Sequence, residues 1–205
     1  MNSTFQILVI DNFDSFTYNL VHLIEALDCK FRVVRNDELD QLKTDEFTHL
    51  IIGPGPGLPA TSGQLMKFLH SWPESKPILG ICLGMQAILE QDGGEIENLP
   101  VVFHGAQDLV YCIDESALFE GISKNFKAGR YHSWGFRTSS IPDQYRIIAD
   151  DSNNLTLAIE HKDRPWFGVQ FHPESIMTEF GMEIMRNFLV TEKTSNPEME
   201  LSPMN

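Results

Sequence analysis

The residue best placed for nucleophilic chemistry in this chain is Cys82, which has a glycine two positions to either side. An apolar run over 77–81 predicts a strand, and a good helix sequence over 83–91 follows at once. Cys82 would then stand at a tight turn, like the nucleophile of a G-x-S-x-G elbow, where a helix N-terminus favours thiolate over thiol. A lone cysteine is usually a buried structural residue, but the flanking glycines and the strand-to-helix switch favour a nucleophile.

A second candidate group lies near the C-terminus, where an apolar strand sequence ends in His172 and Glu174 follows. A cysteine nucleophile needs a base, and the base needs a group that fixes its orientation. Alternation along a strand would place both side chains on one face, although Pro173 disturbs the local geometry. An ordinary structural or surface histidine is the alternative, since the chain has seven.

The same H-x-E spacing occurs in zinc deaminases, but no P-C-x-x-C follows it in this sequence. No H-E-x-x-H and no paired C-x-x-C is present either. We therefore expect no metal site.

The third element is the loop Gly53 to Gly57, which reads G-P-G-P-G after a strand predicted over 49–52. Its glycines expose backbone amides, and such a loop can direct an N–H at a developing oxyanion. Gly-Pro runs alone are usually turns. The loop has no lysine and no Walker pattern, which disfavours a phosphate-binding role.

Strands and helices alternate in the first half of the chain. Strands are predicted over 6–10, 31–34 and 49–52, with helices after Asp14 or Ser15, either of which could be the N-cap, and over 64–71. This order predicts an α/β fold with an open, mainly parallel sheet and helices on both faces. Ligands of such sheets gather at the carboxyl ends of the strands, where both Cys82 and the Gly-Pro loop would lie.

The second half reads as a β-rich extension of the sheet. It contains short strand sequences separated by turns, at 101–103, 109–113, 145–149 and 155–159. A helix is expected over 178–190, and the polar composition from Thr191 to Asn205 predicts a mobile tail. The predicted domain therefore spans residues 1–190.

Length and composition narrow the class of protein. A chain of 205 residues suits one domain, and a net charge of −14 disfavours nucleic acid as a partner. Its three cysteines, Cys29, Cys82 and Cys112, are odd in number and widely spaced, which suits the reducing cytoplasm. No apolar run reaches about 18 residues, and the N-terminus has no signal-peptide pattern, so we expect no membrane association.

Taken together, the elbow, the late H-P-E and the G-P-G-P-G loop resemble the class I glutamine amidotransferases, in the family's order and across nearly the whole chain. The run from Ile10 to Leu20 (I-D-N-F-D-S-F-T-Y-N-L) is similar to the glutaminase subunits of anthranilate synthase and aminodeoxychorismate synthase. Gly129 to Ser133 and residues 176–181 agree with that subgroup.

The resemblance implies that Cys82 is the nucleophile, His172 the base and Glu174 its orienting partner. It also implies an oxyanion hole made by the backbone amides of Gly55 and Leu83. The positions implied to bind the substrate are Gly55, Pro56, Gly57, Gln86, Ser133 and Trp134. Two positions depart from the family pattern: Trp134 stands where leucine is common, and Ala106-Gln107 replaces the lysine of an H-G-K segment.

The activity implied is hydrolysis of L-glutamine, with ammonia passed to a larger chorismate-binding synthase subunit and no cofactor in this chain. The resemblance favours anthranilate synthase, while aminodeoxychorismate synthase, or service to both, stays open. Two rivals of other classes are a cysteine peptidase or thioester hydrolase on a related fold, and a non-catalytic regulatory subunit. The Ile10 to Leu20 run argues against the first, and the intact Cys82, His172 and Glu174 argue against the second.

Overall fold

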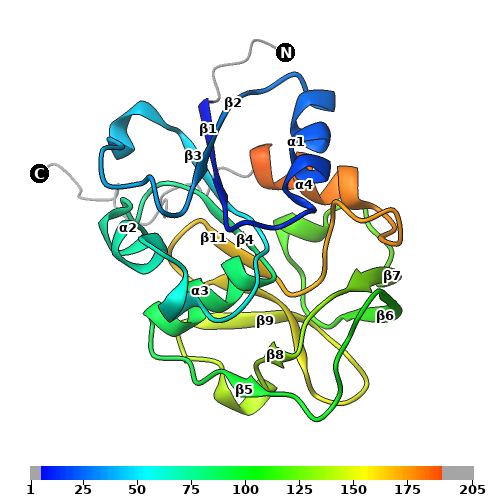
Figure 1. The fold of residues 1–205 in the computed structure, drawn as a ribbon. Coiled ribbons are helices and arrows are strands. Elements are labelled where there is room, and N and C mark those ends of the chain that lie inside the picture. The colour runs from blue at the N-terminus through cyan, green and yellow to red at the C-terminus, as the bar shows by residue number, and fades with distance from the viewer. Residues whose placement is uncertain (1–5, 191–205) are drawn as a thin grey trace, which may run out of the picture.

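The computed structural model describes residues 6–190, and these form one large sheet and one small one (Figure 1). The large sheet has nine strands in the order β2-β1-β3-β4-β11-β10-β9-β6-β7. Its first five strands run parallel, and their bounds are β2 Lys30–Arg35, β1 Gln6–Asp11, β3 His49–Ile52, β4 Ile78–Ile81 and β11 Trp166–Val169. The remaining strands pair antiparallel and are β10 Thr156–His161, β9 Tyr145–Asp150, β6 Ala106–Cys112 and β7 Asn125–Arg130. The small sheet pairs β5 Glu97–Asn98 with β8 Trp134–Gly135.

Helices cover both faces of the large sheet, as the alternating sequence predicts. Helices α1 Thr17–Ala26 and α4 Gly181–Val190 lie side by side on one face, and α2 Leu65–Ser71 and α3 Leu83–Gln91 lie on the other (Figure 1). Strand β1 shows why, because Ile7 and Val9 join the core under α1 and α4 while Leu8 and Ile10 join the core under α2 and α3. Successive side chains of a strand point to opposite faces, so an unbroken apolar run indicates burial on both.

Short 3-10 helices complete the described secondary structure, at Thr44–Glu46, Pro59–Thr61, Ala117–Phe119 and Thr138–Ser140. Among residues 6–190, no helix combines the length and the apolar character needed to cross a membrane. The predicted tail from Thr191 lies outside the described residues.

The strand predicted over 101–103 is wrong. Val101 and Val102 are exposed, and the segment is a loop attached to the sheet by Phe103. The Phe103 N–H donates to the carbonyl oxygen of His132 at 2.9 Å, and the guanidinium of Arg130 stacks 3.6 Å above the Phe103 ring. The apolar run at 101–103 is therefore a loop in which Phe103 alone is fixed, by its hydrogen bond and by stacking on Arg130.

Both expected helix starts also need correction. Helix α1 has Phe16 at its N-cap, and neither Asp14 nor Ser15 caps it through a side chain. The Asp14 carboxylate instead accepts the N–H of Phe16 at 2.8 Å, inside the preceding turn. Helix α4 begins at Gly181 rather than near Thr178, because Phe180 has a left-handed φ of 62° that a helix does not continue through.

Gly84, at the start of α3, lies where the helix crosses the sheet most closely. A Cβ at this position would stand 2.2 Å from the carbonyl oxygen of Ile52. Because this backbone oxygen belongs to a buried strand, Gly84→Ala should lower the free energy of unfolding by at least ~3 kcal/mol. Urea denaturation measures the loss.

Gly93→Ala is the matched control, because Gly93 has a positive φ of 90° but no atom within 4 Å of the added carbon. It should cost about 1 kcal/mol through backbone strain alone. Equal losses in the two variants would contradict the close contact between α3 and β3.

Candidate active site

The site is built around Cys82, which joins β4 directly to α3. Cys82 adopts φ 52° and ψ −103°, a conformation that costs a non-glycine residue free energy and is found at functional turns. Its carbonyl oxygen accepts the first helical hydrogen bond, from the Gln86 N–H at 3.1 Å. The residue is 5% exposed. The predicted strand–cysteine–helix turn is present, with Cys82 at the N-terminus of α3.

His172 and Glu174 form the buried pair that the sequence predicts, with 2.7 Å between His172 Nδ1 and Glu174 Oε1. They do not lie on a strand, however, because β11 ends at Val169 and the expected strand alternation is wrong here. A turn returns Glu174 towards the ring, with the Ser175 N–H donating to the His172 carbonyl oxygen at 3.1 Å. His172 is also anchored by an isolated bridge to Gly129.

Two aromatic rings hold the imidazole of His172 in place. The ring centroid of Tyr131 lies 4.9 Å away and that of Phe16 lies 5.3 Å away, both in edge contacts. Phe16 belongs to the Ile10 to Leu20 run, so this run contributes directly to the position of the His172 ring.

Charge at His172 is set by two opposing effects. Burial lowers the pKa of His172, but its interactions with Cys82 and Glu174 outweigh burial and raise the pKa to about 10. The imidazole is therefore protonated at neutral pH, with Nδ1–H donating to Glu174. Nδ1 is engaged by Glu174, so the proton available for transfer is the one on the buried Nε2.

The Gly-Pro loop approaches the elbow because Gly55 has no side chain. A Cβ on Gly55 would stand 2.5 Å from Cβ of Asn12 and 2.9 Å from Cδ2 of Leu83. The side-chain amide of Asn12 donates to the Gly53 carbonyl oxygen at 2.8 Å, and Asn36 donates to Oδ1 of Asn12 at 3.0 Å. The loop is thus fixed by polar side chains at the carboxyl ends of β1 and β2, and Gly55 lies against Leu83.

A pocket of about 160 Å³ opens at Cys82. Of the positions expected to bind substrate, all line it: Gly55, Pro56, Gly57, Gln86, Ser133 and Trp134. Tyr131 and His132 line it as well; they belong to the Gly129 to Ser133 run noted in the sequence, but no binding role was expected for them. A larger hollow of about 600 Å³ is formed mainly by residues 112–124 and contains none of the expected site residues. The structure therefore brings the candidate residues to one place, while their individual roles remain predictions.

Three buried polar residues near this pocket were missed by sequence reasoning: Arg130, His132 and Gln170. Arg130 and Gln170 are paired with residues far away in the chain, whereas the side chain of His132 is paired two residues away, with Arg130 and Trp134. The clearest case is Gln170, whose amide nitrogen lies 3.5 Å from the sulfur of Cys82, 88 residues earlier. Among residues 6–190, no group of three or more His, Cys, Asp or Glu residues is arranged to hold a metal ion.

Comparison with known proteins agrees with this geometry. The family model "Glutamine amidotransferase class-I" matches residues 8–191. The chain belongs to this family. It is 42% identical over 204 residues to anthranilate synthase beta subunit 2 of Arabidopsis thaliana, covering 95% of this chain and 75% of that one. It is 39% identical over 191 residues to aminodeoxychorismate/anthranilate synthase component 2 of Bacillus subtilis, covering 90% and 96%.

The fold comparison gives the same family architecture. A glutamine amidotransferase from Thermotoga maritima superposes with a TM-score of 0.70 at 14% identity, covering 90% of this chain and 80% of that one. This superposition confirms the α/β fold expected from the sequence, while the family model and the relatives show that the protein is a glutamine amidotransferase.

Two histidines of the amidotransferase site should differ in charge at neutral pH. His172 should be cationic, with a pKa raised to about 10. His132 should be neutral, because burial first and Arg130 second lower its pKa to about 3. Nitrogen-15 NMR of the labelled histidines between pH 5 and 9 tests both. In Glu174→Gln, which removes the carboxylate, the pKa of His172 should fall. Titration of His172 near 6.5 in the wild type would contradict this account.

The three cysteines should differ in reactivity. Burial raises the pKa of Cys112 to about 11, and burial followed by the charge of Asp28 raises that of Cys29, so both should remain thiols at neutral pH. An electrophilic glutamine analogue should label Cys82 alone, and free glutamine should protect it. Site-resolved mass spectrometry measures the labelling, and equal modification of all three would count against the site.

Proposed function

We propose that this amidotransferase is the glutaminase subunit of a chorismate-using synthase, most simply anthranilate synthase in tryptophan biosynthesis. The observation that carries the proposal is the buried His172–Glu174 pair, whose histidine interacts with Cys82, the elbow cysteine that lines a small pocket. Relatives named as components of anthranilate synthase cover nearly the whole chain.

In the proposed reaction, the sulfur of Cys82 attacks the side-chain carboxamide carbon of L-glutamine. The resulting oxyanion accepts hydrogen bonds from the amides of Gly55 and Leu83. His172 donates its Nε2 proton to the leaving nitrogen, the C–N bond breaks, and ammonia departs from the thioester. Neutral His172 then takes a proton from water, and the hydroxyl adds to the thioester carbon. Loss of the sulfur releases glutamate and restores the starting site.

The small pocket supports glutamine over a larger substrate. A volume of about 160 Å³ is well below the several hundred Å³ typical of drug-sized ligands. It suits one amino acid and disfavours the peptidase alternative. The substrate's amino-acid end would meet the backbone of Ser133 and Trp134. If the backbone alone makes this contact, the Trp134 departure from leucine should be tolerated.

The partner of this subunit would be a larger chain that uses the ammonia. Apolar side chains are exposed on the segments that build the site: Phe13 and Tyr18 on either side of Phe16, and Ile176 shortly after Glu174. Exposed apolar residues of this kind support docking of another protein. The Gln107 departure is accommodated, since its amide donates to the Met177 carbonyl oxygen at 2.8 Å in the same region.

The remaining expectations follow from the chemistry. The Cys82, His172 and Glu174 set can supply nucleophile, acid and base, so we propose that this subunit works without a metal or cofactor. A reactive thiol must stay reduced, and the cysteines at 29, 82 and 112 are all unpaired in the structure. These features support a reducing compartment, for which the cytoplasm is our proposal.

Cys82→Ser separates the production of ammonia from its use. The variant should lose glutamine-dependent product formation by at least about 100-fold, because a hydroxyl ionises far less readily than a thiol. The reconstituted complex, given chorismate and an ammonium salt instead, should keep its wild-type rate. The measurement is anthranilate or aminodeoxychorismate formed with each candidate large subunit, which also identifies the partner. Gly55→Pro, which deletes an oxyanion N–H, should impair the same half-reaction.

An intact glutamine rate in Cys82→Ser would place the nucleophile elsewhere. Loss of both rates would show that Cys82 is needed for assembly, and the division of labour would be wrong.

A further inference from the structure

We propose that Gln170 activates the nucleophile by donating a hydrogen bond to the sulfur of Cys82, and that a buried hydrogen-bond network through Gln86 and the Trp134 carbonyl holds its amide in that orientation. The proposal deepens the glutaminase function and rests on it for the role of Cys82.

The sulfur end of the network consists of two buried amides. Gln170 has no exposed surface, and its Nε2 lies 3.5 Å from Sγ of Cys82. Its Oε1 accepts from Nε2 of Gln86 at 3.2 Å. The same Gln86 nitrogen donates to the Trp134 carbonyl oxygen at 3.1 Å. Gln170 thus connects the sulfur to the backbone strip that lines the pocket.

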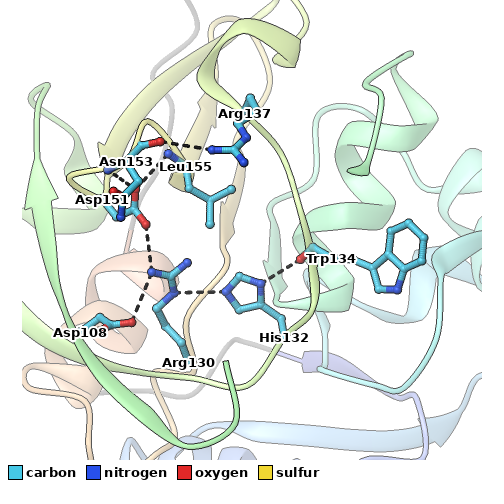
Figure 2. A network of polar contacts seen from close by, with 8 residues as sticks. All are labelled: Asp108, Arg130, His132, Trp134, Arg137, Asp151, Asn153 and Leu155. Atoms are coloured by element: carbon cyan, nitrogen blue, oxygen red, sulfur yellow. Dashed lines mark hydrogen bonds and ion pairs between the residues drawn. The ribbon is translucent and has the colours of Figure 1, made fainter. Parts of the chain in front are cut away.

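A second arm of the network reaches the same Trp134 carbonyl oxygen from a buried guanidinium, shown in Figure 2. His132 Nδ1 lies 2.8 Å from the Trp134 carbonyl oxygen, and the Nε–H of Arg130 donates to His132 Nε2 at 3.2 Å. Arg130 is almost fully buried, with its Nη1 3.1 Å from Asp151 and 3.4 Å from Asp108. Asp151 in turn accepts two backbone N–H groups through its other oxygen, at 2.8 and 3.0 Å.

Arg130 fixes the direction of the hydrogen bonds from its guanidinium to the Trp134 carbonyl, because a guanidinium only donates. His132 Nε2 must therefore accept, and the pKa of His132, lowered to about 3 by burial and by Arg130, keeps that nitrogen free of a proton. The remaining proton is on Nδ1, which donates to the carbonyl of Trp134.

The same logic orients the two glutamines. A carbonyl only accepts, so Gln86 presents its NH₂ group to Trp134, and this group also faces Gln170. Gln170 must therefore accept from Gln86 through its oxygen, which leaves its NH₂ group facing the sulfur. The reversed amide would set NH₂ against NH₂ and an oxygen against the sulfur. A donor at that point stabilises the thiolate more than the thiol.

Gln170→Leu removes the donor at similar size, and Gln170→Glu replaces it by an acceptor of the same shape. The control is Thr156→Val, a buried position whose hydroxyl has no partner among the described residues. It is next to Leu157, whose carbonyl accepts the Gln170 N–H. The control therefore tests the effect of a buried substitution close to Gln170 that leaves the hydrogen-bond network unchanged.

The first measurement is the iodoacetamide labelling rate of Cys82 against pH, resolved by mass spectrometry, with Cys29 and Cys112 as internal references. In Gln170→Leu the pH of half-maximal labelling should rise by about one unit, and in Gln170→Glu by at least as much. Thr156→Val should match the wild type. In the assembled complex, Gln170→Leu should lower kcat for glutamine about tenfold and leave KM nearly unchanged.

An unchanged labelling profile in Gln170→Leu would overturn the proposal, even if kcat fell, because packing alone would then explain the loss. Circular dichroism shows whether the leucine variant folds, and if it does not, the isosteric glutamate variant decides. Labelling does not depend on turnover. A wild type that labels at Cys82 but hydrolyses no glutamine with any large subunit would refute the proposed function and leave the test of Gln170 intact.

Discussion

The site depends on one steric constraint, the close crossing of strand β4 and helix α3 over β3. At Gly80 a Cβ would stand 2.4 Å from the backbone of Gly84, and at Gly84 it would stand 2.2 Å from the Ile52 oxygen. Two missing side chains let the chain turn within one residue, and that residue is Cys82 with its positive φ. A conformation of this kind costs roughly 1–3 kcal/mol, which burial on both faces of the sheet offsets. The reactive side chain is thereby presented between a buried strand and the buried start of a helix.

Two kinds of sheet meet at this point. The parallel half ends its strands beside the elbow and contributes the nucleophile, the Asn12-supported loop and, just past β11, the His172 turn. The antiparallel half contributes the opposite wall of the pocket, from Tyr131 to Trp134, which β8 and β5 fix. Because His172 bridges to Gly129 of β7, the base is anchored to both halves at once. A change in either half can therefore alter the distance between base and sulfur.

How much of this could be read from sequence depends on how local each cause is. The elbow was predictable because two glycines around one cysteine act within five residues, and the His172–Glu174 pair because it closes within three. The apolar run at 101–103 was wrongly predicted as a strand, because Phe103 stacks on Arg130, a residue far from it in the sequence. The role of Gln170 was not predictable for the same reason, because only folding brings this buried amide to its partners Cys82 and Gln86.

The hydrogen-bond network also explains why the charged Arg130 can be buried beside the neutral His132 of the pocket. An unpaired guanidinium in this position would cost several kcal/mol. Arg130 is paired with Asp151 and Asp108 and stacked on Phe103, which offsets that cost. Its Nε–H determines the tautomer of His132. The Trp134 carbonyl, which only accepts, orients the amides of Gln86 and Gln170 up to the sulfur. Asp108 is the most exposed member of this network, and it follows directly on Gln107, which holds the Met177 carbonyl. Surface contacts at the start of β6 therefore have a continuous covalent and hydrogen-bonded connection to the nucleophile.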